Sequence, residues 1–259
     1  MPSFATAARE YATSPVQTVR EDAKLASVEH QLTEHDISGL PVLDAAGHAV
    51  GVITRTDLLR AGRMRVPNGH RARVLELPDG YVRDFMHIGV RTVEADAPVG
   101  EAARVMVKHR LHRVYVMQND TLVGVLSTKD MMRVVSDARV RTALSEVMSS
   151  SLVTVRASDP VSIAVDRMAA AHVSGLIVMD EEWPIGIFSQ PEAIASRSSP
   201  PGDRVEVWMD PAVLCLPSAM PLHRAAAQSL HTRARRVLVV DARSVLGVIS
   251  GLDFARAVS

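Results

Sequence analysis

The chain has 259 residues, of which 47% are hydrophobic, and it carries 29 basic and 29 acidic side chains. This composition is sufficient for one large or two ordinary packed domains, whereas the even charge balance excludes a global field that would hold nucleic acid or an anionic membrane. The single cysteine, Cys215, excludes an internal disulfide. The N-terminus has no export signal and no apolar stretch is long enough to span a membrane, so we expect a cytoplasmic protein without membrane contact.

Four copies of one pattern follow one another along the chain. Their centres are the segments HAVGVITRTD, TLVGVLSTKD, WPIGIFSQPE and SVLGVISGLD, with glycines at positions 51, 124, 186 and 247. The period is about sixty residues, with one insertion after the first copy. We therefore divide the chain into repeat 1 (1–60), an arginine-rich insertion (61–80), repeat 2 (81–138), repeat 3 (139–200) and repeat 4 (201–259).

Each copy predicts the element order β-α-β-β-α. A short β-branched strand (VQTV, GVRTV, SLVTV or AVLCL) precedes a helix with apolar residues at helical spacing, as in Val99, Ala102 and Met106. A nearly continuous apolar strand (LPVL, VYVM, LIVM or VLVV) then leads to the glycine-centred strand and a second helix, such as Asp130 to Ser136. Strands that are apolar along their length favour sheets covered on both faces, so the units are expected to pair.

Repeats 2, 3 and 4 share two further features. The short segments VRDFM (82–86), LSEVM (144–148) and VEVWM (205–209) precede them and are interpreted as linker helices that fix how successive units sit. A proline lies just inside the predicted start of the first helix, where its missing N–H costs little; these are Pro98, Pro160 and Pro221.

The second helix of every copy begins with a hydroxyl residue followed three positions later by an acid. The pairs are Thr54 with Asp57, Ser127 with Asp130, Ser189 with Glu192, and Ser250 with Asp253. Such a pair can form a capping box at the helix N-terminus. Alternatively, the carboxylate can accept hydrogen bonds from both hydroxyls of a ribose while the helix amides attract phosphate. Both interpretations stay open, except that the longer Glu192, which follows Pro191, is not expected to bind ribose.

The residues just before the second strand alternate between copies. Repeats 1 and 3 have Ser38-Gly39 and Ser174-Gly175, whereas repeats 2 and 4 have His112-Arg113 and Arg235-Arg236. A guanidinium group suits phosphate and stays charged, so each basic pair could contact the phosphates of a ligand. The alternative is that the basic pairs complement the dipole of the preceding helix and are solvated.

This organisation resembles the cystathionine beta-synthase (CBS) domain family, in which SGLPVLDAAGHAVGVITRTDLL (38–59) is close to the usual motif. The resemblance implies an α/β (α+β) fold of four tandem β-α-β-β-α CBS repeats paired into two Bateman modules, copy one with two and copy three with four. It also implies an adenosine-containing ligand, such as AMP, ADP, ATP or S-adenosylmethionine, between paired repeats. The gamma subunit of AMP-activated protein kinase is similar in organisation and places His-Arg pairs against ligand phosphates.

Carried over residue by residue, the resemblance predicts a set of ligand-binding positions. They comprise first-strand threonines, the hydroxyl and acid of copies one, two and four, and the basic pairs: Thr18, Thr54, Asp57, Thr92, His112, Arg113, Ser127, Asp130, Arg235, Arg236, Ser250 and Asp253. Thr18 and Thr92 are expected to line the base pocket.

We therefore predict a stand-alone regulatory sensor of an adenine nucleotide that signals to an unknown regulated protein. No motif of an acyl-transfer, phosphate-loop, dinucleotide or zinc-protease site is present, so we expect neither an enzyme nor a required cofactor or metal. A homodimer is expected. Two alternatives remain: a ligand-free scaffold in which the acids only cap helices, and a nucleic-acid binder that uses the arginine-rich insertion, which the even charge balance disfavours.

Overall fold

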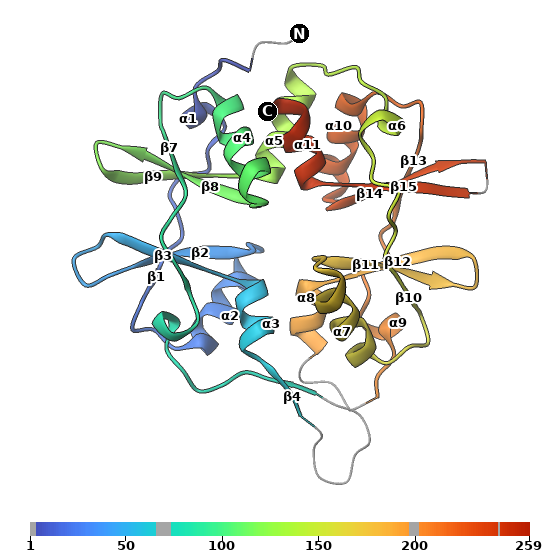
Figure 1. Ribbon diagram of the computed structural model, residues 1–259, viewed down its shortest axis with the longest axis horizontal. Helices are drawn as coiled ribbons and strands as arrows, with labels where there is room; N and C mark the ends of the chain where they lie inside the picture. Colours follow the sequence, from blue (N-terminus) through green and yellow to red (C-terminus); the bar gives the residue numbers. More distant parts are fainter. Residues whose placement is uncertain (1–3, 66–73, 197–201, 243) are drawn as a thin grey trace. The chain divides into compact units, whose positions relative to one another are not determined.

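The computed structural model describes residues 4–65, 74–196, 202–242 and 244–259. It contains the four predicted repeats (Figure 1). Repeat 1 has β1 (Val19–Arg20), α2 (Leu25–Glu34), β2 (Gly39–Leu43), β3 (Ala49–Thr54) and α3 (Arg55–Ala61). Repeat 2 has β7 (Thr92–Glu94), α4 (Val99–His109), β8 (Arg113–Gln118), β9 (Thr121–Ser127) and α5 (Thr128–Asp137). Repeat 3 has β10 (Thr154–Arg156), α7 (Val161–Ala171), β11 (Gly175–Asp180), β12 (Trp183–Ser189) and α8 (Gln190–Ala195). Repeat 4 has β13 (Leu214–Pro217), α10 (Leu222–Thr232), β14 (Arg236–Asp241), β15 (Ser244–Ser250) and α11 (Gly251–Val258).

Each repeat builds a small mixed sheet around its central strand. The first strand pairs with the second in parallel, which the intervening helix makes possible, and the second pairs with the third as an antiparallel hairpin. The α/β class and the order β-α-β-β-α are thus confirmed. The first strand is short in every repeat, and Thr18 lies one residue before β1 rather than within it.

The chain forms two compact units. The even unit comprises residues 1–16, 91–152 and 213–259 and contains repeats 2 and 4; the odd unit comprises residues 17–90 and 153–212 and contains repeats 1 and 3. Each unit is therefore assembled from repeats that are not neighbours in the sequence.

Helices join the two repeats of the even unit. α5 packs against both α10 and α11, and α11 also packs against α4 (Figure 1). Buried side chains of both repeats form one continuous core, which includes Met106 and Met131 of repeat 2 and Leu222 and Phe254 of repeat 4. The two repeats of this unit consequently share their hydrophobic stabilisation.

The odd unit has a smaller junction between its repeats. α3 packs against α8, and these helices have 7 and 6 residues, compared with 10 in α5 and 8 in α11. Its two cores are separate: Ile194 of α8 reaches the core of repeat 1, and Leu59 of α3 packs against the core of repeat 3. Short second helices leave less apolar surface to share.

In the described part of the chain, four short linker helices lie outside the β-α-β-β-α pattern. They are α1 (Ala8–Tyr11), the 3-10 helix η1 (Val82–Asp84), α6 (Leu144–Val147) and α9 (Val205–Trp208); the last three were predicted and α1 was not. Each buries one residue completely, respectively Ala8, Val82, Leu144 and Val205. These residues anchor the linkers to the cores.

The linkers pack on a different repeat from the one that they precede. After α1, Thr13 bridges Val125 of repeat 2, and after η1 the strand β6 (His87–Ile88) pairs with β3 of repeat 1. Likewise Ser149 bridges repeat 4 and Asp210 bridges repeat 3, so the linkers are exchanged within each pair of neighbouring repeats. The predicted architectural role therefore takes the form of a chain exchange.

Two further expectations are refined by the structure. Pro98, Pro160 and Pro221 are N-cap residues, one position before the helix, where an extended backbone suits their ring. The arginine-rich insertion contains the antiparallel strands β4 (Arg63–Arg65) and β5 (Val74–Glu76), and its residues 66–73 lie outside the described part of the chain. Among the described residues, no helix has the length and apolar character needed to cross a membrane.

Candidate ligand-binding site

The hydroxyl and acid at the start of each second helix form the predicted cap. In repeats 1, 2 and 4 the backbone N–H of the hydroxyl residue donates to Oδ2 of the aspartate at 2.8 Å, and the hydroxyl donates to the same oxygen at 2.7 to 2.9 Å. In repeat 3, Ser189 makes the same two bonds to Oε2 of Glu192, at 2.8 and 2.6 Å. The longer acid caps as well as the shorter ones, so the capping interpretation is confirmed in all four copies.

The second carboxylate oxygen distinguishes repeat 3 from the others. Oδ1 of Asp130 lies 3.5 Å from Arg133, and Oδ1 of Asp253 accepts a hydrogen bond from Arg256 at 2.7 Å. An arginine three residues after the acid recurs in repeat 1 as Arg60, whereas repeat 3 has Ala195 there. Residues three apart are neighbours on a helix. The contact of this arginine with the acid could therefore have been predicted from the sequence, although the arginine was not among the predicted site residues.

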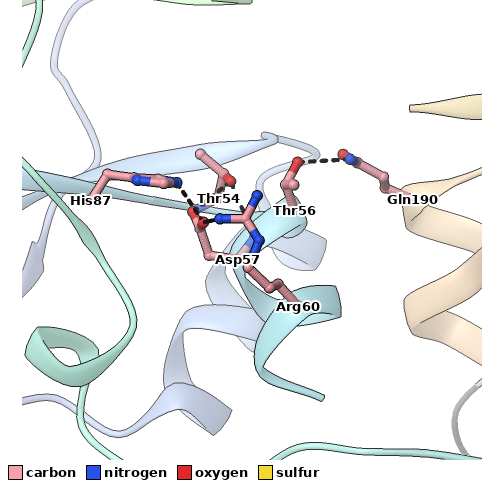
Figure 2. Close-up of polar contacts among 6 residues, drawn as sticks. All are labelled: Thr54, Thr56, Asp57, Arg60, His87 and Gln190. Carbon is pink, nitrogen blue, oxygen red and sulfur yellow. Dashed lines mark hydrogen bonds and ion pairs between the residues drawn. The ribbon is translucent and has the colours of Figure 1, made fainter. Parts of the chain in front are cut away.

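Repeat 1 adds a histidine to the same carboxylate edge (Figure 2). Nε2 of His87 lies 2.9 Å from Oδ1 of Asp57, and Arg60 is 3.9 Å from that oxygen. The Asp57 side chain is 2% exposed, whereas that of His87 is 62% exposed. His87 belongs to the linker strand β6, thirty positions along the chain, and sequence reasoning did not identify it.

Strand pairing places each basic pair beside a cap. In the antiparallel ladder of repeat 2, Arg113 lies opposite Ser127, and in repeat 4 Arg236 lies opposite Ser250. The carbonyl of His112 also accepts a hydrogen bond from the N–H of Thr128 at 3.0 Å. The structure therefore brings together the basic pair, the hydroxyl and the acid that the sequence separates.

The two basic pairs of the even unit are close enough for the charge of one to affect the pKa of the other. Although His112 is exposed to solvent on one side, desolvation by the neighbouring protein, followed by the charges of Arg113 and Arg236, lowers the pKa of His112 from 6.5 to about 4. Arg236 belongs to repeat 4, so its charge reaches the histidine of repeat 2. His112 is accordingly neutral at pH 7 in a positively charged environment, and an anion is the ligand that such an environment favours.

The N-termini of paired second helices lie next to each other. In the odd unit, Nε2 of Gln190 donates to Oγ1 of Thr56 at 2.7 Å (Figure 2). In the even unit, the first residues of α5 and α11, Thr128 and Gly251, are in close contact. The partial positive charges of two helix N-termini therefore add up in each unit.

The predicted threonines of the first strands are less closely connected with these groups. Thr92 begins β7 and lies opposite Tyr115, two residues along β8 from Arg113. Thr18 precedes β1 and is half-buried. Their assignment to a base pocket stays a prediction.

The model of the CBS domain matches residues 8–63, 82–137, 144–196 and 204–259. An uncharacterized 17.7 kDa protein of Acidianus ambivalens is 27% identical over 135 residues, which are 52% of this chain and 76% of that one. Homoserine O-acetyltransferase of Methanohalobium evestigatum is 30% identical over 103 residues, which are 39% of this chain and 21% of that enzyme.

A solved structure gives the same fold over nearly the full length. It is a protein of Methanocaldococcus jannaschii, proposed to be an archaeal homologue of the gamma subunit of AMP-activated protein kinase, with a TM-score of 0.81 and 16% identity over 97% of this chain and 99% of that one. The four small mixed sheets are consistent with repeats paired into Bateman modules. The matched model covers most of the sequence, and the chain belongs to the CBS domain family, with four CBS domains.

Proposed function

We propose that this protein is a regulatory sensor of an adenosine-containing ligand, and that the ligand is AMP, ADP or ATP. CBS domains are typically regulatory rather than catalytic. The observation that carries the proposal is the pairing of Arg113 with Ser127 and of Arg236 with Ser250. Each places an arginine directly across the ladder from the serine that caps a helix with a buried aspartate.

The chemistry of this arrangement suits a nucleotide. Oδ2 of the aspartate is used in the cap, while Oδ1 retains lone pairs that can accept the hydroxyls of a ribose. The arginines provide charge-assisted donors for phosphate, and the partial positive charge of the helix N-termini favours an anion. Asp57, Asp130 and Asp253 would hold the ribose, and His112, Arg113, Arg235 and Arg236 would contact the phosphates.

Regulation requires that the ligand bind one arrangement of the repeats more tightly than another. A nucleotide that draws together groups of different repeats has such a preference. We propose that the change is passed to a regulated protein, that the chain acts as a cytoplasmic homodimer, and that it needs no cofactor besides the regulatory nucleotide.

A ligand-free scaffold is the second candidate, and the caps favour it. All four acids, including Glu192, already accept two hydrogen bonds from their own helix N-terminus. In that case the acids stabilise the helices and bind nothing else.

Thermal unfolding in the presence of AMP, ADP, ATP or S-adenosylmethionine, each at about 1 mM, tests the two functions. A ligand at about a hundred times its Kd adds about 2.7 kcal/mol to the free energy of unfolding, which for this chain length raises Tm by roughly 5 to 10 °C. The variants are Asp57→Asn, Asp130→Asn and Asp253→Asn. Glu192→Gln is the matched control, because it changes the same cap in the repeat that has no arginine at the acid.

A sensor gives a rise in Tm with at least one nucleotide that the aspartate variants reduce and Glu192→Gln keeps. A scaffold gives no rise with any nucleotide, and all four variants lower Tm similarly in its absence. A rise that none of the aspartate variants reduces would show binding elsewhere and overturn the proposed site.

A further inference from the structure

His87 reaches the carboxylate of repeat 1 from a segment outside that repeat. It lies on β6, the strand that follows η1 and leads toward repeat 2, and its Nε2 is 2.9 Å from Oδ1 of Asp57 (Figure 2). The other oxygen of Asp57 is occupied by the cap. His87 thus covers the edge of the carboxylate that a ribose would need.

The linker strand holds the imidazole in this place. β6 pairs with β3 through His87 opposite Val52 and Ile88 opposite Gly51, and the N–H of Gly89 donates to the carbonyl of Val50 at 2.8 Å. A Cβ on Gly51 would lie 2.4 Å from the carbonyl oxygen of His87. The missing side chain of Gly51 therefore allows the strand to approach, and the backbone fixes the position of His87.

In the other repeats, the linker residue at the position equivalent to His87 has no basic side chain. The residue that lies against the position after the central glycine is Thr13 in repeat 2, Asp210 in repeat 3 and Ser149 in repeat 4. In repeats 2 and 4 the aspartate faces an arginine of its own helix instead, Arg133 or Arg256. Repeat 1 alone combines the buried aspartate with a histidine from a linker.

We propose that His87 is a proton-controlled gate that competes with the ligand for Asp57. The inference rests on the proposed function, because it takes Asp57 as a ribose-binding group. A histidine is a cation only when it is protonated, so only a protonated imidazole forms an ion pair with the carboxylate of Asp57, 2.9 Å away. Acid therefore closes the gate, and a mildly alkaline solution opens it.

The other groups around Asp57 do not change charge in this pH range. Arg60 stays protonated, and the Arg55 guanidinium points to the carbonyl of Leu32 at 2.8 Å and lies 3.9 Å from Asp36. Gln190 and Thr56, which adjoin the helix N-terminus, are uncharged. Of the contacts that the described residues make with the Asp57 carboxylate, the one with His87 is therefore the one whose charge depends on the protonation of a histidine.

With this gate, the ligand affinity of repeat 1 depends on pH through His87, whereas that of repeats 2 and 4 does not. A ligand that takes the edge of Oδ1 on which His87 lies must turn the imidazole aside, while the backbone pairing of β6 with β3 remains. Repeats 2 and 4 bind through acids that face arginines, and their affinity lacks this dependence on pH.

The test uses the full chain with the aspartates of repeats 2 and 4 replaced, so that ligand binding reports repeat 1 alone. A reporter protein with Asp130→Asn and Asp253→Asn retains only Asp57, and a second protein adds His87→Gln. AMP binding to both is measured by calorimetry at pH 6 and pH 8. The phosphate of AMP itself titrates near pH 6, but that contribution is common to the two proteins, so the difference between them reports His87.

We expect the affinity of the reporter to fall roughly 1.5- to 5-fold more between pH 8 and pH 6 than that of the protein with His87→Gln, as for the loss of one largely exposed ion pair. Equal pH dependence in the two proteins would overturn the gate and leave the sensor function intact. AMP binding to wild type but not to the reporter would also overturn it, because repeat 1 would then hold no site. If AMP and the other nucleotides bind to no protein, including wild type, the proposed function fails and the gate with it.

Since the His87 side chain is mostly exposed, the substitution is expected to leave the fold intact. The circular dichroism spectrum and Tm of each protein check this. His87→Asn, which keeps a neutral donor on a shorter side chain, is the second variant and should behave as His87→Gln does.

Discussion

Thr128 and Gly251, the first residues of α5 and α11, meet where the two helices of the even unit begin. A Cβ on Gly251 would lie 2.4 Å from Oγ1 and 2.6 Å from Cβ of Thr128. The Cβ of Thr128 is fixed to its helix and has no rotamer that would move it away. The approach of repeats 2 and 4 at this point therefore requires glycine at position 251.

Gly251→Ala is expected to destabilise the protein by about 1 to 3 kcal/mol, the usual cost of overpacking. The sign is informative, because alanine in place of glycine otherwise stabilises a helix by about 1 kcal/mol. Urea unfolding of wild type and variant measures the difference.

The control exchanges the two side chains. Thr128→Gly removes the Cβ that Gly251→Ala meets, so the double variant should recover most of the loss in a double-mutant cycle. If Gly251→Ala alone is as stable as wild type, the contact between the two helix N-termini does not exist as described.

Hydrogen exchange should differ between the units. α5 and α11 are part of one continuous core, whereas α3 and α8 are shorter and join two separate cores. Because local opening is easier where fewer apolar contacts must be broken, amides in α3 and α8 are expected to exchange faster than those in α5 and α11. Mass spectrometry of peptides from the four helices measures this, and equal protection would contradict the difference in core packing.

The repeats and caps could be predicted because their signals are local and periodic. A glycine every sixty residues or so defines the copies, and the spacing of Ser127 and Asp130 lies within one helical turn. The arginine after the acid, as in Arg133, lies at equally short range and was available in the sequence. In repeats 2 and 4 it contacts the same carboxylate that forms the cap.

The exchanged linkers could not be predicted from local pattern. Thr13 meets Val125 and Ser149 meets Val248 across about a hundred residues, and nothing in either short segment indicates its partner. The contact of His87 with Asp57 depends on one of these exchanges, so it is equally invisible in the sequence. The assembly of repeats 2 and 4 through their helices likewise depends on packing rather than on periodicity.

Acid should destabilise the protein partly through His112. Desolvation, with the charges of Arg113 and Arg236, lowers its pKa in the folded protein to about 4, whereas the unfolded chain has the usual value of 6.5. Between these two values the unfolded state binds more protons than the folded one, so the stabilising contribution is complete above pH 6.5 and is lost as pH falls toward 4.

His112→Gln removes this proton linkage. Between pH 7 and pH 5, the free energy of unfolding of wild type is expected to fall more than that of the variant, as measured by urea unfolding at both values. The other nine histidines are common to the two proteins and cancel in the difference. An equal fall would mean that His112 is not held in its neutral form by its surroundings.

Substitutions in the basic pairs should weaken the binding of AMP, which has a phosphate, more than the binding of adenosine, which has none. Arg236 lies opposite Ser250 and its charge reaches His112, so a phosphate near both pairs would gain charge-assisted hydrogen bonds worth about 1.5 to 3 kcal/mol each. Arg236→Gln is therefore expected to weaken AMP binding by roughly 10- to 150-fold while changing adenosine binding little. Asp253→Asn, in the same repeat, should weaken both ligands because it removes a ribose contact. Calorimetry with the two ligands and the two variants decides the matter: if Arg236→Gln weakens adenosine and AMP alike, the arginine supports the fold of the site and does not contact phosphate.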